Sequence, residues 1–364
     1  MFRRFIISLI VFILFGNGFV QAQHGSSMAD STNLSYQILP VAWYVPETGF
    51  TVGLTGISTF RLKGEPKTSR ASAINFDAAV TMRGKVFAFV PFEIYKYNEK
   101  YRLKGEIGMY KYQYSFYGIG GQSLKDNKEK YNVVFPRLLF NLSRRVSGPV
   151  FLGLGYRFDH FDINKIENEG ILSNQRPLGV EGGTISNLFL SFLLDSRDHI
   201  FDTRKGFYIE TFLEKSTPYF GATYTYQKIE SDFRSFHEVQ KNLVLANNLY
   251  FTKMIGDVPF FTMPYLSTSR RGRGFADRRF MDKTLLNFQS ELRFPLFWRL
   301  EAAVMVSAGV LGPSINGLDF NDIKWAYGTG FRYIVNKEER NKIRLDLGFT
   351  GEDFNFYITA NEAF

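Results

Sequence analysis

A strict alternation of apolar and polar residues is the feature that most restricts how this 364-residue chain can fold. In residues 354–364, Phe354, Phe356 and Ile358 share one face and polar side chains occupy the other, with only Glu362 out of step. The same period of two recurs in three earlier segments, 285–294, 325–333 and 343–350. Successive side chains of a β-strand point to opposite faces, so this period predicts strands rather than helices.

The length of the segments and the chemistry of their faces favour a transmembrane barrel over a soluble sandwich, which would also alternate. The segments are about ten residues long, which matches the ~9–11 residues that a tilted strand needs to cross a bilayer. One face carries Phe, Leu, Ile and Tyr, which suit lipid, and the other carries Arg, Asp and Glu, which suit a wet lumen. We therefore expect the 62 aromatic residues (39 Phe, 20 Tyr and 3 Trp) to lie largely on the lipid face and in two interfacial girdles.

Sixteen segments have the pattern expected of strands: 36–44, 49–61, 72–82, 85–95, 100–113, 131–143, 149–162, 184–195, 206–216, 221–234, 241–253, 284–294, 299–310, 323–335, 341–350 and 354–364. They predict an all-β fold, a 16-stranded antiparallel transmembrane β-barrel of the outer membrane that spans residues 36–364. The even number agrees with single-chain bacterial barrels. With both chain ends in the periplasm, the long connections all fall outside: 114–130, 163–183, 254–283 and 311–322. Only 62–71 is long for a periplasmic turn.

The amino terminus has the organisation of a secretory signal. Arg3 and Arg4 precede an apolar run over 5–15, and Val20-Gln21-Ala22 has the small residues of a cleavage site. A membrane anchor is the alternative, but the run is shorter than the ~20 residues that a spanning helix needs. We expect residues 1–22 to be removed, residues 23–35 to form a short periplasmic lead-in, and no periplasmic module to precede the barrel. The expected location is the outer membrane of a Gram-negative bacterium.

Three short motifs, in order along the chain, resemble those of a known family. The first is Ser-Arg-Arg-Gly-Arg-Gly-Phe at 269–275, between the eleventh and twelfth predicted strands. The second joins Asp195 and Arg197 to Gly206, in the turn before the ninth strand, and the third is Glu-Leu-Arg-Phe-Pro-Leu at 291–296. Together they resemble the BamA/TamA-like barrels, the bacterial surface antigen superfamily of outer-membrane assembly and translocation proteins.

The resemblance implies a clamp between the 254–283 loop and the barrel wall. In the family, this loop folds into the barrel and its arginine meets acidic residues on strands twelve and thirteen. The clamp would therefore be built on the tip Arg273-Gly274-Phe275, with Arg273 as the buried cation and Glu291 as one acceptor. Ser307 stands where the family usually has a second acid, so one carboxylate is expected unless Glu301 substitutes.

The alternative for this loop is a basic exterior surface that touches lipopolysaccharide phosphates. Five arginines lie within ten residues: Arg270, Arg271, Arg273, Arg278 and Arg279. We expect Arg273 to point inward and the other four to face lipid or solvent.

Enzyme chemistry has no support in the sequence. There is no cysteine, and the four histidines have no metal-ligand spacing, so no metal site and no cofactor are predicted. Asp159 and His160 are adjacent on a predicted strand and point to opposite faces, which excludes a catalytic pair. No nucleophile elbow or phosphate loop is present, and only the net charge of +9 favours nucleic acid, which we do not expect as a partner.

The resemblance implies work at the seam between the first and last strands, with Pro40 near one edge and Phe364 ending the other. Pro40 cannot donate to a strand ladder, which either weakens the seam for lateral opening or simply starts a short strand. The leading hypothesis is a factor that aids insertion or export of proteins, with client outer-membrane proteins and separate periplasmic docking proteins as partners. A plugged passive pore or exporter and a structural subunit of an envelope complex are the alternatives.

Overall fold

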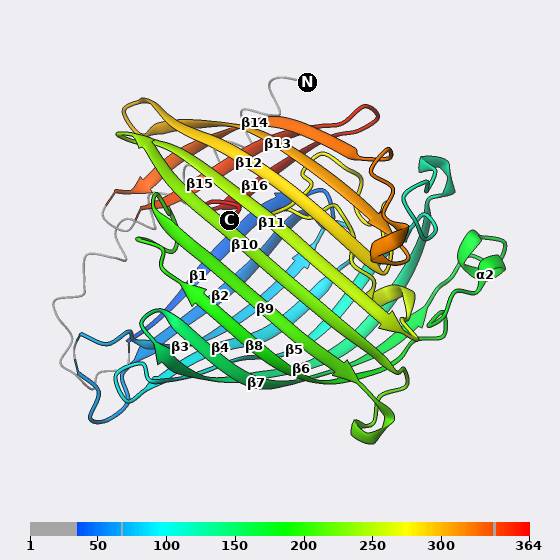
Figure 1. The fold of residues 1–364 in the computed structure, drawn as a ribbon, viewed down its shortest axis with the longest axis horizontal. Coiled ribbons are helices and arrows are strands. Elements are labelled where there is room, and N and C mark those ends of the chain that lie inside the picture. The colour runs from blue at the N-terminus through cyan, green and yellow to red at the C-terminus, as the bar shows by residue number, and fades with distance from the viewer. Residues whose placement is uncertain (1–34, 67, 338–339) are drawn as a thin grey trace.

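The protein is a closed barrel of sixteen antiparallel strands (Figure 1). The computed structural model describes residues 35–364 except 67, 338 and 339, so the predicted signal and all but the last residue of the lead-in lie outside the described residues. The strands are β1 (Ser35–Val45), β2 (Gly49–Phe60), β3 (Ser72–Thr81), β4 (Val86–Lys96), β5 (Tyr101–Phe116), β6 (Glu129–Ser147), β7 (Val150–Asn164), β8 (Gly183–Asp195), β9 (Gly206–Ser216), β10 (Tyr226–Gln240), β11 (Leu243–Gly256), β12 (Thr284–Phe297), β13 (Leu300–Gly312), β14 (Lys324–Asn336), β15 (Asn341–Phe349) and β16 (Phe354–Ala360). The predicted fold class is confirmed.

The largest difference is in β10, which starts five residues and ends six residues later than predicted, and β16 also differs. β10 starts five residues late because the preceding loop continues through a 3-10 turn over Pro218–Phe220. Gly221, with φ +83°, ends that turn. β16 ends at Ala360, so the prediction that the strand runs to Phe364 is wrong. Asn361 has φ +59°, which ends the strand and turns residues 362–364 into the lumen. Glu362, out of step in the sequence, marks this turn.

The connections differ between the two ends of the barrel. One end, here the long-loop end, carries the segments 117–128, 165–182, 217–225, 257–283 and 313–323. They include the short helix α2 (Ile171–Gln175). The opposite, short-turn end has connections of two to four residues except at 61–71 and 196–205. Among the described residues no helix is long and apolar enough to cross a membrane.

Apolar side chains cover the outer face of the strands, as the alternation predicts. On β7 and β8, Leu152, Leu154 and Leu190 are exposed, whereas Phe151 and Phe189 on the opposite face are buried. An outward apolar band of this kind is what a barrel presents to lipid.

The lumen is not uniformly polar, because part of its wall is aromatic. On β5, Tyr110, Tyr112 and Tyr114 stack in sequence with centroids 5.9 and 5.2 Å apart. Phe135 on β6 and Phe161 on β7 continue the stack at 4.7 Å. The expectation that aromatic residues lie largely on the lipid side is therefore wrong for this part of the wall, which forms an apolar core inside the barrel.

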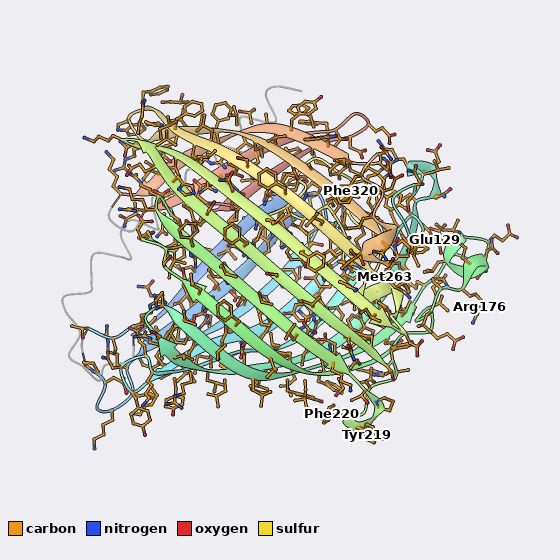
Figure 2. The ribbon with its side chains drawn as sticks, viewed as in Figure 1. Glu129, Arg176, Tyr219, Phe220, Met263 and Phe320 are labelled. Atoms are coloured by element: carbon orange, nitrogen blue, oxygen red, sulfur yellow. The ribbon has the colours of Figure 1, made fainter. Side chains whose placement is uncertain are left out.

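The β11–β12 loop fills this core from the long-loop end. Phe261 packs on Phe161 with centroids 4.4 Å apart, and Phe260 meets Phe116 and Tyr131 edge to face. Met263 lies in the same cluster, at the long-loop end of the barrel (Figure 2). The loop is thus held by buried apolar contacts as well as by the polar contacts described below.

Replacing Phe261 by Ala should release this part of the loop while leaving the barrel closed. Removing a buried Phe side chain costs about 3–5 kcal/mol, and here the lost contacts join the loop to the wall rather than strand to strand. Limited trypsin digestion should cut faster at Arg270 and Arg271, with heat-modifiable migration retained. Tyr219→Ala is the matched control because Tyr219 is 95% exposed on the β9–β10 loop, away from the barrel wall (Figure 2). Equal digestion of the two variants would contradict the prediction.

Candidate functional site

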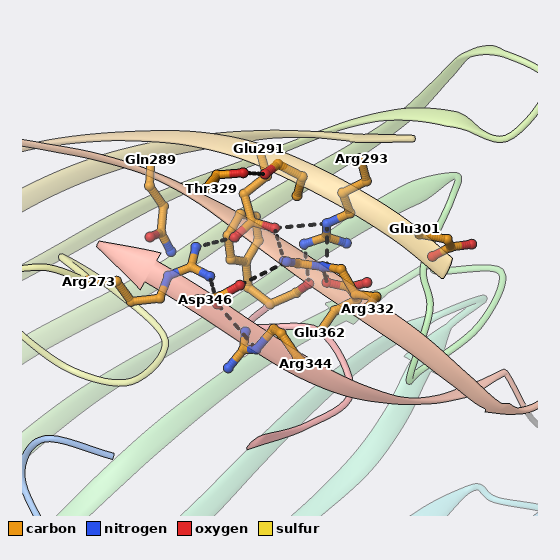
Figure 3. Close-up of polar contacts among 12 residues, drawn as sticks. Arg273, Gln289, Glu291, Arg293, Glu301, Thr329, Arg332, Arg344, Asp346 and Glu362 are labelled. Atoms are coloured by element: carbon orange, nitrogen blue, oxygen red, sulfur yellow. Dashed lines mark hydrogen bonds and ion pairs between the residues drawn. The ribbon is translucent and has the colours of Figure 1, made fainter. Parts of the chain in front are cut away.

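The tip of the β11–β12 loop places a guanidinium inside the barrel. Arg273 is buried and donates to Glu291 on β12 through Nη2 and to Asp346 on β15 through Nη1 (Figure 3). Both carboxylates are fully buried. Burying an unpaired charge is very unfavourable, so these contacts are what allow the arginine to lie there.

Arg273 and its two acceptors belong to a larger network of paired charges. Arg332 on β14 lies 2.8 Å from Asp346 and 3.1 Å from Glu362, which comes from the residues after β16. Further pairs are Arg293–Glu291 at 2.9 Å, Arg293–Glu362 and Arg332–Glu291 at 3.5 Å, Arg344–Asp346 at 3.3 Å, Lys342–Glu362 at 3.5 Å, Lys342–Asp202 at 2.7 Å and Lys342–Glu301 at 2.5 Å. Four arginines and one lysine thus face five carboxylates, which balances the buried charge.

Two glycines allow the loop tip to touch the wall. Gly274 has φ +123°, a conformation that side chains rarely adopt. On β15, a Cβ atom at Gly348 would lie 2.6 Å from the Arg273 carbonyl. The contact between loop and strand is therefore backbone against backbone, and a larger residue at either position would push the tip away.

The loop tip is also bonded to the last strand. The Gly274 N–H donates to the Tyr357 hydroxyl at 3.1 Å, and Asn355 Nδ2 donates to the Gly274 carbonyl at 2.7 Å. Phe275 packs edge to face on Phe280. The tip thus bridges β12, β15 and β16, close to where the barrel closes.

The second acceptor of Arg273 was not predicted from the sequence. Ser307 accepts a hydrogen bond from Asn287 at 3.0 Å rather than from Arg273, and Glu301 pairs with Lys342 instead. The expectation of one carboxylate is wrong because Asp346, two strands beyond β13, reaches the same point. The sequence does place Asp346 and Arg344 on a polar face, but only closure of the barrel shows what they meet.

Three of the four remaining loop arginines point inward, contrary to the expectation that they face lipid or solvent. Arg271 stacks on Tyr250 at 3.5 Å, Arg278 is buried against tyrosine rings, and Arg279 binds Glu352 and the Ser123 carbonyl. Arg270 is solvent-exposed, but its charged neighbours Asp232 and Arg234 lie on the lumen face of β10. Stacking on rings and carbonyl contacts provides partners that a sequence pattern does not reveal.

The predicted turn motif lies at the short-turn end, between β8 and β9. Arg197 makes two hydrogen bonds to Asp195, at 2.8 and 2.9 Å, and stacks on Tyr208. Gly206 has φ +111°, and a Cβ atom there would lie 2.3 Å from the Ser196 carbonyl. The contacts of this motif lie at the two ends of the 196–205 connection, where β8 ends and β9 starts.

The seam between β1 and β16 is short. The two strands are matched at one residue pair, Tyr44 with Ile358, whereas β1 and β2 are matched over eleven pairs and β15 and β16 over seven. Residues 35–43 of β1, which precede Tyr44 and include Pro40, are matched with no strand residue on the β16 side in the described part of the chain. The chain after Ala360 has turned inward instead, and Phe364 packs on Phe236 and Arg293.

Among the described residues there is no cluster of three or more His, Asp or Glu side chains that could hold a metal ion. Asp159 faces the lumen and pairs with Arg137, while His160 is exposed and contacts Thr184. The site therefore consists of the buried ion pairs around Arg273 and the unpaired edge of β1.

The fold and the site define a class of protein: closed β-barrels in which a buried arginine holds a loop inside the lumen. Residues 74–363 match the Omp85 superfamily domain, and the chain belongs to the Omp85 superfamily. This confirms the resemblance to BamA/TamA-like barrels. A comparison with curated proteins finds no match by sequence.

Solved structures share the fold at low sequence identity. BamA from Haemophilus ducreyi lacking POTRA domains 1–3 has a TM-score of 0.63 and 11% identity, over 91% of this chain and 70% of that one. CdiB from Acinetobacter baumannii has a TM-score of 0.56 and 12% identity, over 91% of this chain and 66% of that one. At these identities the likeness is one of fold.

Replacing Arg273 by Ala should release the loop tip and weaken the barrel. Glu291 and Asp346 would each lose a buried partner, and breaking such a pair costs about 3–5 kcal/mol. We expect faster proteolysis within 257–283 and unfolding at lower denaturant, with Arg270→Ala as the exposed control in the same loop. The clamp interpretation fails if barrel assembly, loop protease resistance and heat-modifiable migration are all unchanged.

Glu362 should make the barrel sensitive to acid. Burial alone would raise the pKa of this carboxyl, but Arg332, Arg293 and Lys342 outweigh burial and lower the pKa from 4.5 to about 2. A lowered pKa stabilises the fold above pH 4.5, and that stabilisation is lost as the pH falls towards 2. Glu362→Gln should therefore show a smaller loss of stability between pH 6 and pH 3 in guanidinium unfolding than the wild type. Glu169→Gln, at an exposed loop position, should behave as the wild type does; equal pH dependence in all three proteins would refute the assignment.

Proposed function

We propose that this chain is a non-enzymatic outer-membrane barrel that aids the insertion or export of proteins, acting at the seam between β1 and β16. The observation that carries the proposal is the free edge of β1 below Tyr44. Superfamily membership and the resemblance to assembly and translocation barrels agree with it.

A free strand edge can bind another polypeptide by strand addition. Unpaired N–H and C=O groups at a sheet edge form a template for a further strand. In lipid the same groups are costly when unpaired, so a partner strand at this edge is strongly favoured. The exposed side chains Tyr36 and Ile38 lie on the lipid face of this part of β1. A client strand that paired here would sit in the membrane next to the barrel wall.

The filled lumen argues against a passive pore. The 257–283 loop occupies the long-loop end, and at the short-turn end Lys342 ties Asp202 of the β8–β9 turn to Glu362 of the chain end. Conduction would require these buried contacts to break. Export through the lumen requires the same change and is the second candidate, supported by the fact that the plug is a loop rather than a strand.

The charge of the turns suggests where a docking protein binds. The seven connections at the short-turn end contain twelve Lys and Arg against six Asp and Glu, whereas the eight at the long-loop end contain twelve of each. We infer that an acidic periplasmic protein docks at the short-turn end, because the excess of positive charge there attracts a negatively charged partner. Lipopolysaccharide contact through the loop arginines loses support, because only Arg270 is exposed.

A disulfide across the seam tests the proposal. Directly opposed residues of antiparallel strands have Cα atoms about 4.5–5.5 Å apart, within the range of a disulfide, and the chain has no cysteine to interfere. Tyr44→Cys with Ile358→Cys should, when oxidised, fail to restore the outer-membrane proteome of a depleted strain and recover on reduction. Ala42→Cys with Val52→Cys, opposed on β1 and β2, is the control that leaves the seam free.

The outcome distinguishes the candidates. Loss of many barrel proteins on locking supports insertion, and loss of a single exported product supports export. Full function of the locked protein would show that the seam does not need to open.

A further inference from the structure

A cavity of about 200 Å³ lies between the β11–β12 loop and the barrel wall. From the loop it is lined by Phe261, Tyr265 and Arg278, and from the wall by aromatic and charged side chains of β5 to β11. It is separate from the network around Arg273, none of whose members lines it. The wall side combines rings, such as Tyr114 and Phe161, with ion pairs.

Arg278 is a buried cation without an ionic partner. Its side chain is 7% exposed, and its guanidinium carbon lies 3.8 Å from the ring centre of Tyr114 and 4.5 Å from that of Tyr265. Within the described part of the chain no carboxylate lies within ion-pair distance of it, including the neighbouring Asp277. Its buried Nε and Nη1 atoms have no hydrogen-bond partner there either.

The other cations of the cavity are all paired. Arg137 and Arg157 share Asp159 at 2.8 and 2.6 Å, and Lys228 pairs with Glu214 and with Glu230. Arg278 is therefore the lining cation without an ion pair, and two of its nitrogen atoms have no hydrogen-bond partner. A buried guanidinium with unpaired N–H groups lacks hydrogen bonds that it would make in water, and an incoming acceptor restores them.

We propose that this cavity binds a small organic oxyanion with a flat apolar body, of the aromatic monocarboxylate class, with its carboxylate on Arg278. The rings that line the cavity supply the apolar surface for the body of the ligand. The rings of Tyr114 and Tyr265 lie against the guanidinium, and edge-on contact is how arginine binds carboxylates. The other lining cations, Arg137, Arg157 and Lys228, are already paired with carboxylates, so a second negative group on the ligand would find no unpaired cation.

Such a ligand would join the loop to the wall. It would touch Arg278 and Phe261 on the loop and Tyr114 and Phe161 on the strands. Binding only to the docked loop stabilises that arrangement, so occupancy should slow proteolysis of 257–283.

Titration of the folded full-length barrel in detergent with benzoate tests the site, using calorimetry and ligand-observed NMR. Benzamide, the neutral analogue, corrects for partition into the micelle, and terephthalate tests the limit of one charge. Benzoate should bind saturably and at least about tenfold more tightly than either, because its carboxylate makes charge-assisted hydrogen bonds to Arg278. Equal binding of benzoate and benzamide would overturn the proposal.

Two variants assign the binding to Arg278. Arg278→Gln should weaken benzoate about tenfold or more, whereas Arg270→Gln, which removes the same charge from an exposed position of the same loop, should not. Unchanged affinity in Arg278→Gln would refute the assignment. Should that variant fail to fold, crystals of the wild type soaked in bromide decide the question: an anomalous peak within hydrogen-bond distance of Arg278 supports the site, and its absence there rejects it.

Discussion

Pairing of buried charge inside the barrel is the constraint on which the rest of this structure depends. Arg273 can lie in the lumen because Glu291 and Asp346 accept its hydrogen bonds. Arg332 continues from Asp346 to Glu362, and Lys342 continues from Glu362 to Asp202. A chain of ion pairs therefore runs from the loop tip to the turn at the opposite end, and each member is tolerable only because its neighbours are present.

The same network shapes the seam. Its contacts to Glu362 hold the end of the chain inside the lumen, and those residues are the ones that would otherwise continue β16 alongside β1. The free edge of β1 is thus linked physically to the buried charges rather than being caused by Pro40 alone. The loop tip also bonds to Tyr357 and Asn355 of β16, so loop, chain end and seam form one connected unit.

The lumen is divided by chemistry. Around Arg273 it is ionic, whereas on the side of β5 to β7 it is an aromatic core against which Phe260 and Phe261 of the loop pack. The loop is consequently held by two unlike sets of contacts, one that depends on charge and one that depends on burial. Sequence periodicity identified the strands but could not assign these aromatic residues to the lumen, since a stripe of Tyr and Phe suits lipid and an apolar core equally well.

The sequence by itself determined the all-β class, the number of strands and the placement of all but one to within about four residues, because a period of two is a local property of a strand. It also indicated Arg273 and Glu291 as partners through the resemblance of their motifs. Only the tertiary structure decided that Asp346 is the second acceptor, that Arg278 is buried without an ionic partner, and that the chain leaves β16 at Asn361. Each of these features depends on which strands and loops meet across the closed lumen. Contacts between segments that are far apart in the sequence are not encoded in a local residue pattern.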